Sequence, residues 1–307
     1  MITPIFDVLG FGAVAVDDLL YVDEYPPPES KVRVRHRLRQ CGGLTGTALV
    51  AAARLGARSG YVGLLGNDEL SQYVTDCFAR EGIDTTHCVR RADTGVVHST
   101  IIVDERHKTR TVFASLPGAI GADAELPSAE LIRLARVILV DHHGVEGSIR
   151  AARIARESGV GVVADFERVP KGNFAELLAV VDHLVISERF ARELTGQADP
   201  AKATKALWTP KRRAVVVTSG AKGSWYLGEG FAEPVHCPAY KVEVVDTTGC
   251  GDVFHGAYSA ALAWGKSLAE CVEFASAAAA LKAAKRGGQA GCPTRQAVEE
   301  RLGAPSL

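Results

Sequence analysis

The sequence predicts an α/β protein in which a mostly parallel central sheet is covered by helices on both faces, giving a three-layer α/β/α sandwich. Short runs of Val, Ile and Leu alternate with Ala- and Leu-rich stretches of helical length along most of the chain. Such alternation is typical of parallel sheets, because each crossover between parallel strands is usually made by a helix. The 307 residues contain no recognisable linker or repeat, so we expect a single domain over residues 1–307.

The core elements can be placed in order along the chain. Predicted strands are short apolar runs bounded by turn-forming residues, and they cover residues 6–9, 60–64, 137–140, 161–164, 183–186 and 214–218. Predicted helices are the longer stretches between them, and they cover residues 46–55, 71–81, 148–157, 188–194 and 268–285.

Two segments interrupt this alternation, residues 19–40 and 98–113. The first contains three prolines followed by KVRVRHRLRQ, in which apolar and basic residues alternate, and the second is predicted as two strands around residues 104–108. Both patterns indicate half-exposed antiparallel strands, so we expect a small β-sheet lid beside the main domain. The alternative is a solvated edge strand that its charges protect from aggregation.

Residues 246–257, DTTGCGDVFHGA, carry the most informative pattern in the chain. A strand end at 242–245, a Gly-rich turn at 247–251 and a helix at 253–264 would point the N–H groups of Gly249, Cys250 and Gly251 out of a helix N-terminus, where an anion is stabilised. Asp252 would stand beside this anion hole as a general base, which is an arrangement suited to phosphoryl transfer. The alternative is an ordinary turn with Asp252 as a helix cap.

The string D-T-T-G-x-G-D resembles the C-terminal signature of the ribokinase-like (PfkB) carbohydrate kinases. The resemblance implies an ATP-dependent sugar kinase of ribokinase-like fold, with Mg2+ and, in many members, a monovalent cation such as K+ as cofactors. It also implies that residues in three loops bind the nucleotide: Thr218, Gly220, Gly223, Thr248 and Gly288.

The same resemblance assigns the sugar site to the N-terminal half. Asp17 is then the acid that binds sugar hydroxyls, with Asp18 as its competitor, because alternation along a strand lets only one of the two point inward. Gly42 and Gly43 form the floor of the pocket. The family usually has GGNxxN here, whereas this chain has GGLTGT, and a further sugar contact is assigned to Thr47.

His143 is also assigned to the sugar. His142 and His143 follow the predicted strand 137–140, at the end where ligands bind in an open α/β sheet. The alternative is that one of them caps a carbonyl and the other lies on the surface.

Within the family, the chain resembles the sulfofructose kinase and ketohexokinase branch. It has Ala114 and His143 where sulfofructose kinases present an Asn and an Arg to the sulfonate, so a sulfosugar is not the expected substrate. The NxxE motif that organises magnesium is also missing, with Ser187 and Phe190 in its place. We therefore expect magnesium to be held through ATP and water, with Asp246 as an outer-sphere contact.

Composition narrows the possible partners. The 35 basic and 36 acidic residues give a net charge of −1, which favours neither a nucleic acid nor a membrane surface. The seven cysteines form no CxxC pair, and the N-terminus has no basic targeting region, so we expect a cytoplasmic protein with reduced thiols. The helix dipole would lower the pKa of the Cys250 thiol unless packing buries it. We also expect a homodimer formed through the lid.

The function predicted from the sequence is transfer of the ATP γ-phosphoryl group to a primary hydroxyl of a small sugar, with a ketose as the expected substrate. A nucleoside kinase and a non-catalytic sugar sensor are the alternatives. Gly10-Phe11-Gly12 also resembles the start of a dinucleotide-binding fingerprint, but the following residues continue as a strand into three prolines and provide no helix for a pyrophosphate.

Overall fold

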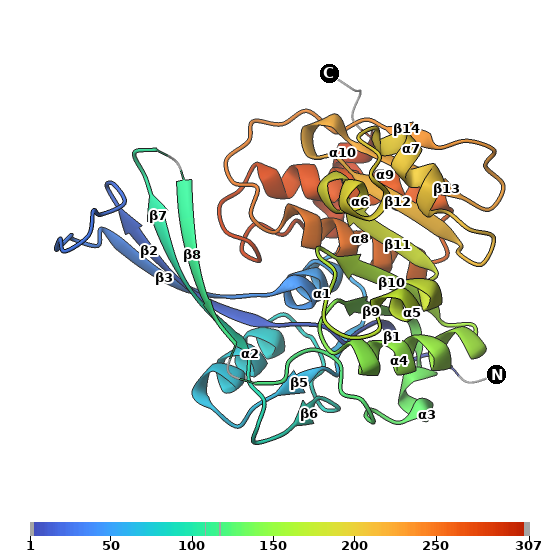
Figure 1. Cartoon of the computed structure of the whole chain (residues 1–307), viewed down its shortest axis with the longest axis horizontal. Coiled ribbons are helices and arrows are strands. Elements are labelled where there is room, and N and C mark those ends of the chain that lie inside the picture. Colours follow the sequence, from blue (N-terminus) through green and yellow to red (C-terminus); the bar gives the residue numbers. More distant parts are fainter. Residues whose placement is uncertain (1–2, 108, 117, 304–307) are drawn as a thin grey trace.

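The computed structural model describes residues 3–107, 109–116 and 118–303. Its main body is built on one sheet of eight strands (Figure 1), in the order β14-β13-β12-β11-β10-β9-β1-β4. Neighbouring strands from β12 to β4 run parallel, while β13 and β14 are antiparallel additions at one edge. The strand bounds are β1 Phe6–Gly10, β4 Ser59–Tyr61, β9 Ala135–Asp141, β10 Gly161–Phe166, β11 His183–Ser187, β12 Ala214–Thr218, β13 Ser224–Gly228 and β14 Val235–Cys237.

Helices cover both faces of this sheet and enclose two hydrophobic cores. Along β9, Val137 and Leu139 belong to one core, whereas Ile138 and Val140 belong to the other, as the alternation of side chains along a strand requires. The first core is closed by α1 Leu44–Arg54, α2 Glu69–Arg80, α8 Cys250–Ala263, α9 Leu268–Ala283 and α10 Arg295–Gly303. The second is closed by α3 Ala129–Ile132, α4 Val145–Glu157, α5 Phe174–Val180, α6 Glu188–Thr195 and α7 Pro200–Leu207. The predicted three-layer sandwich is confirmed.

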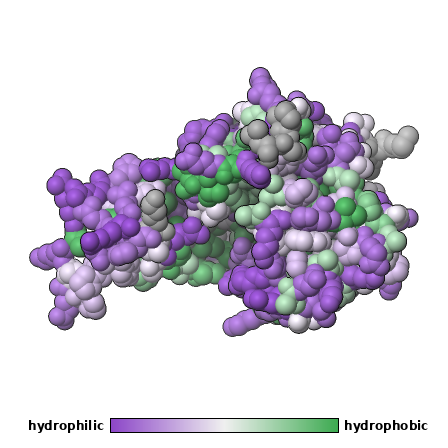
Figure 2. Space-filling model, turned by 90° about the horizontal axis from the view of Figure 1, so that it is seen from above, coloured by the Kyte–Doolittle hydropathy of each residue, from purple (hydrophilic) through white to green (hydrophobic). Residues whose placement is uncertain are grey.

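The two interrupting segments form the predicted small sheet, which we call the lid. Its order is β3-β2-β7-β8, with β2 Ala15–Val22, β3 His36–Gly42, β7 Val97–Asp104 and β8 Thr109–Ser115. The strand β2 pairs antiparallel with β3 and parallel with β7. The lid projects from the main body, and Figure 2 shows apolar side chains gathered around the hollow where the two meet. A separate short pair, β5 Leu64–Leu65 and β6 Val89–Arg90, lies below the lid.

Several boundaries differ from the prediction. Of KVRVRHRLRQ, only the part from His36 onward is a strand. The predicted strand 60–64 is divided between β4 and β5, and Lys108 of the predicted turn lies outside the described residues. Residues 242–245 are not a strand: Val244 and Val245 are 61% and 51% exposed, and the N–H of Val245 bonds to the carbonyl of Ala283 instead of to a sheet. Within the described residues, no helix combines the length and the apolar character needed to cross a bilayer.

Candidate active site

The site lies at the edge of the sheet where the parallel strands reach their carboxyl ends, the usual ligand-binding edge of an open α/β sheet. Asp141 ends β9 and Asp165 lies one residue before the end of β10. The helix α8 begins at the same edge, because Gly249 adopts a left-handed φ of 78° as its N-cap and turns the chain into the helix. The helix therefore starts at Cys250, three residues earlier than predicted, and this places Asp252 in its first turn.

The carboxyl group of Asp252 is surrounded by other acids. Burial raises its pKa well above the ordinary value, and the charges of Asp165, Glu167, Asp141 and Asp17 raise it further. The charge of Asp17 acts on Asp252 from the lid strand β2, and those of Asp141, Asp165 and Glu167 from the main sheet and the loop after it. Asp252 therefore interacts electrostatically with acids of both the lid and the main body, and both favour its protonated form.

His255 anchors the first turn of α8 to the sheet. Its Nε2 is 2.8 Å from the carbonyl oxygen of Val185 in β11, and its Nδ1 is 2.8 Å from that of Gly251 and 3.2 Å from Oδ2 of Asp165. Burial lowers the pKa of His255 and raises that of Asp165. The ring fixes the first turn of α8, which contains Asp252, relative to the sheet, so His255 has a packing and hydrogen-bonding role.

The loop before α8 differs from the predicted anion hole in one donor. The N–H of Cys250 donates to the carbonyl of Thr247 at 3.2 Å, so it is not free to receive an anion. Within the described part of the chain, the N–H groups of Gly249, Gly251 and Asp252 donate to no protein acceptor. The donor set that the structure offers therefore keeps Gly249 and Gly251, loses Cys250 and gains Asp252.

The side chain of Cys250 is half-buried, and burial raises the pKa of its thiol, with further contributions from the carboxylates of Asp246 and Asp252. The sequence left two alternatives for Cys250, a pKa lowered by the helix dipole and a side chain buried by packing, and the structure favours the second. Desolvation and the two neighbouring acids outweigh the dipole and the nearby ammonium of Lys282.

The carboxylate of Asp246 stabilises the loop before α8 by accepting two backbone hydrogen bonds. Its Oδ1 accepts the N–H of Thr248 at 2.8 Å, and its Oδ2 accepts the N–H of Gly287 at 2.9 Å. Both oxygens accept backbone donors, so Asp246 holds the loop closed. Each carboxylate oxygen keeps a further lone pair, and the outer-sphere contact to magnesium stays a prediction. Within the described residues, no three His, Cys, Asp or Glu side chains converge as ligands for a metal ion.

Thr47, which is predicted to bind the sugar, lies close to Thr248 and Gly288, which are predicted to bind the nucleotide. A Cβ on Gly249 would lie 3.2 Å from Cα of Gly288 and 3.4 Å from Cγ2 of Thr47, and a Cβ on Gly288 would lie 3.9 Å from Cγ2 of Thr248. Glycine is required at 249 by its φ, and the close approach of the 285–291 loop leaves little space there. Thr47, Thr248 and Gly288 therefore lie close together, which is a finding of the structure because the sequence assigned Thr47 to a different ligand from the other two.

The lid carries Asp17 and Gly42, two of the residues predicted to bind the sugar. A Cβ on Gly42 would lie 2.4 Å from Oδ2 of Asp17, so the carboxylate lies directly over this glycine. Burial raises the pKa of Asp17, against the effect of a hydrogen bond from Ser99. Gly43 caps α1 with a φ of 85° and leaves no room for a side chain beside Val14.

Asp18 faces the other side of the lid, as alternation along the strand requires. Its carboxylate bonds to Arg39 at 2.7 Å and to His98 at 2.8 Å. These contacts lower the pKa of Asp18 to about 2. Asp17 is consequently the acid that the structure places toward the site.

A hydrogen-bonded group that the sequence analysis missed is centred on Asp141. Its Oδ2 accepts the N–H of Ala13 at 2.6 Å and the hydroxyl of Thr45 at 3.1 Å, and its Oδ1 is 3.1 Å from Nδ1 of His143. Arg168 donates to Nε2 of His143 at 3.3 Å, which places the ring proton on Nδ1. Position at the carboxyl end of a parallel strand is the signal that could have identified Asp141.

The other residues predicted to bind the nucleotide lie at the carboxyl end of β12 and in the turn after it. Thr218 ends β12, and the turn after it contains Gly220 and Gly223 at φ values of 55° and 90°. A Cβ on Gly223 would lie 2.1 Å from the carbonyl oxygen of Cys237, so only glycine fits this approach. Among the described residues, no hydrogen bond links this turn to the start of α8.

Arg110 connects the lid to the segment leading into α8, residues 246–251, which we call the anion loop. The sequence analysis also missed this residue. This exposed residue of β8 donates from Nη1 to the hydroxyl of Thr248 at 2.7 Å. A guanidinium group beside the free N–H donors adds positive charge at the place where a phosphate would bind.

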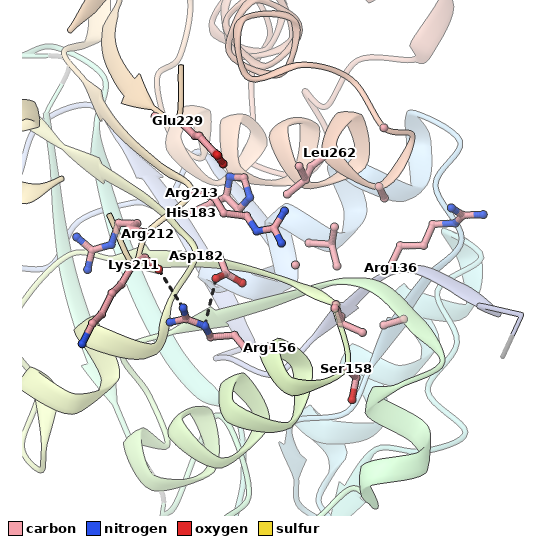
Figure 3. A pocket seen from close by; sticks show the side chains of 18 of the residues that line it. Arg136, Arg156, Ser158, Asp182, His183, Lys211, Arg212, Arg213, Glu229 and Leu262 are labelled. Carbon is pink, nitrogen blue, oxygen red and sulfur yellow. Dashed lines mark hydrogen bonds and ion pairs between the residues drawn. The ribbon is translucent and has the colours of Figure 1, made fainter. Parts of the chain in front are cut away.

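A cavity of about 1260 Å3 lies elsewhere, at the opposite edge of the sheet (Figure 3). It contains many basic side chains, but Arg156 donates to the carbonyls of Ala179 and Lys211, and Arg212 donates to those of Leu178 and Leu207. These carbonyls belong to helix ends and adjoining loops, where cations are stabilising and an added anion is not. Arg156 and Arg212 therefore have a structural role, and we place the active site at the other edge.

Comparison with known proteins gives a consistent result. A model of the "pfkB family carbohydrate kinase" matches residues 7–295. A ribokinase from Haemophilus influenzae is 30% identical, with 95% of this chain and 96% of the relative aligned. Fructokinase-1 from Oryza sativa subsp. japonica is 27% identical over 95% of this chain and 96% of its own length.

Solved structures agree in fold. A crystal structure of a putative ribokinase from Agrobacterium tumefaciens is similar with a TM-score of 0.89 and 30% identity, covering 96% of both chains. The structure of Arabidopsis thaliana ribokinase complexed with ribose and ATP gives a TM-score of 0.85 at 23% identity and covers 99% of this chain and all of the other, which supports the fold alone.

Proposed function

Because the chain belongs to the pfkB family of carbohydrate kinases, we propose that it transfers the γ-phosphoryl group of ATP to a primary hydroxyl of a small sugar. The observation that carries this proposal is the position of Asp252, in the first turn of α8, between the acid of the lid and the free N–H donors of the anion loop.

In this mechanism Asp252 takes the proton of the attacking hydroxyl. The base must be ionised to do so, and its raised pKa brings it closer to that of a base working near neutral pH. The N–H groups of Gly249 and Gly251 and the N-terminus of α8 stabilise the negative charge of the phosphoryl group during transfer. Arg110 adds its charge from the lid.

ATP binds in this proposal with its phosphates at the anion loop and its nucleoside toward β12 and the 285–291 loop. Thr218, Gly220, Gly223, Thr248 and Gly288 line this path. Magnesium would be held through the ATP phosphates and water, which is its usual preference, and would supply positive charge at the transferred phosphoryl group. That charge would also reduce the repulsion among the carboxylates of Asp252, Asp165 and Glu167.

The sugar lies between the lid and the main body. Asp17 accepts hydrogen bonds from its hydroxyls, Gly42 and Gly43 form the floor, and Thr47 and His143 complete the contacts. We propose a small ketose, in agreement with the fructokinases among the relatives and with the resemblance to ketohexokinase. An acidic sugar is the second candidate, because the exposed guanidinium of Arg168 stands 3.3 Å from His143 and provides the charge that the sequence analysis found missing at this corner.

The test is ADP release from the purified protein with ATP, Mg2+ and a panel of ketoses, aldoses, sugar acids, sulfosugars and nucleosides. We expect the highest kcat/KM with a ketose. A nucleoside as the best substrate would replace the proposal by a nucleoside kinase. Tight binding of a sugar without phosphorylation of any compound would identify a non-catalytic sensor.

A further inference from the structure

Lys282 is fully buried in α9, with no exposed surface, although lysine is almost never fully buried without compensation. Its Nζ donates to the carbonyl oxygen of Asp246 at 2.7 Å and to that of Lys285 at 3.2 Å. The helices α8 and α9 pack side by side (Figure 1), and the bond to Asp246 places the ammonium group against the loop before α8.

The space around the lysine is shaped for it. A Cβ on Gly291 would lie 2.6 Å from Cδ of Lys282, so the chain passes this point closely enough to exclude another side chain. The charge of Lys282 contributes to the lowered pKa of Asp246, and it opposes the rise in the pKa of the Cys250 and Cys292 thiols. Arg54, which bonds to the carbonyl of Gln289 at 2.8 Å, is the further cation facing this region.

The Lys282 ammonium and the Asp246 carboxylate together connect the loop before α8 to the loop after α9. The lysine holds the carbonyls of 246 and 285, while the Asp246 carboxylate accepts N–H groups from 248 and 287. Without a cation, two carbonyl dipoles would point into one buried space with no donor, which is unfavourable. The conformation that leaves the N–H groups of Gly249 and Gly251 free therefore depends on a positive charge at this point.

We propose that the Lys282 ammonium is a built-in cation that holds the anion loop in its phosphate-binding conformation, so that this chain requires no free monovalent cation for catalysis. The inference rests on the proposed kinase function. Lys282 is a positioning residue, because its Nζ contacts the back of the loop and not a reacting group. The two carbonyls and the carboxylate are oxygen groups that a K+ or NH4+ ion could also satisfy if the lysine were removed.

The test compares Lys282→Met, which removes the charge and retains an apolar side chain of similar shape, with Lys202→Met, which alters an exposed lysine of α7. The value of kcat and the KM for ATP are measured in tetramethylammonium buffer and then with added Na+, K+ or NH4+. We expect the wild type and Lys202→Met to change less than about 2-fold with any ion, since no site is vacant. Lys282→Met should lose on the order of 10-fold or more in kcat and recover a saturable part of it with K+ or NH4+.

Two results would overturn the proposal. One is a wild type that K+ stimulates strongly. The other is a folded Lys282→Met that keeps full activity, or whose lost activity no ion restores, since Lys282 would then be a packing residue. If Lys282→Met does not fold, Lys282→Gln is judged by the same criteria, and the wild-type titration remains decisive. Inactivity of the wild type with every sugar would refute the proposed function, whereas the dependence of ATP affinity on K+ in the variants would still test Lys282.

Discussion

Asp252 carries a carboxyl group at a position where ionisation is unfavourable, because burial and four neighbouring acids all oppose its negative charge. In the unfolded chain the group ionises near its ordinary pKa, whereas the folded chain retains the proton to higher pH. Between these two pKa values the folded state binds more protons, so the free energy of unfolding falls as the pH rises.

Asp252→Asn removes this ionisation and should therefore stabilise the protein at pH 8, by about 1.4 kcal/mol for each unit by which the folded pKa exceeds the unfolded one. The difference should vanish below the ordinary pKa of an aspartate. Thermal unfolding of both proteins between pH 4 and pH 8 measures it. A variant less stable than the wild type at pH 8 would mean that the Asp252 carboxylate is favourably paired.

The two adjacent acids of β2 give a matched pair of variants. Asp17→Ala should raise the KM for the sugar strongly and leave ATP affinity unchanged, because Asp17 lies over Gly42 at the site. Asp18→Ala should have little effect on either constant, because Asp18 bonds to Arg39 and His98 on the other face. Steady-state kinetics and ATP titration decide, and the reverse ranking would place the sugar on the outer face of the lid.

At the scale of the elements, α8 depends on a close approach to α1. A Cβ on Gly256 would lie 2.1 Å from the carbonyl oxygen of Ala48, which is closer than real Cβ atoms come to backbone. Gly256→Ala should therefore force the two helices apart and destabilise the protein by about 1–3 kcal/mol. Gly303→Ala in α10, where a Cβ would meet nothing within 4 Å, is the control. Equal denaturant midpoints for the two variants would contradict this packing.

The central elements could be predicted from sequence because their signals are local. The strand 214–218 and the helix beginning at Leu268 match β12 and α9 at these ends, since apolar patterning and a capping box mark them. The valines at 242–245 gave the same local signal, but within the described residues they belong to no strand. Val244 and Val245 are exposed, and the N–H of Val245 bonds to the carbonyl of Ala283. Pairing depends on tertiary position, which a local pattern does not contain.

The site residues likewise fall into those that a local pattern predicts and those that only tertiary packing identifies. Asp252, Asp17 and the glycines at 42, 43 and 249 could be predicted because each has a motif or a backbone requirement. Asp141 and Lys282 could not. Each belongs to an ordinary strand or helix pattern in sequence, and only the packing of distant segments gives Asp141 its donors from Ala13 and Thr45 and buries the ammonium of Lys282.

At the scale of the whole molecule, the lid leaves two edge strands and one face uncovered. The strand β8 is exposed along its described length, and Phe113 is 54% exposed on the face away from Asp17, since it pairs with Thr100, which pairs with Asp18. We predict a homodimer through the lid. Phe113→Lys should shift the mass measured by light scattering toward the monomer, whereas Val169→Lys, an exposed residue of the main body, should not. A fully active wild-type monomer at micromolar concentration would contradict the prediction.

The most direct test of the account is 31P NMR of the reaction with the best sugar from the panel, for the wild type and for Asp252→Asn. The account predicts one sugar phosphate formed for each ATP consumed by the wild type. It also predicts a kcat lower by on the order of 10²-fold or more in Asp252→Asn, with ATP affinity nearly unchanged. Near-normal turnover by Asp252→Asn would contradict the account, because the proton would then leave the sugar by a route that does not involve the first turn of α8.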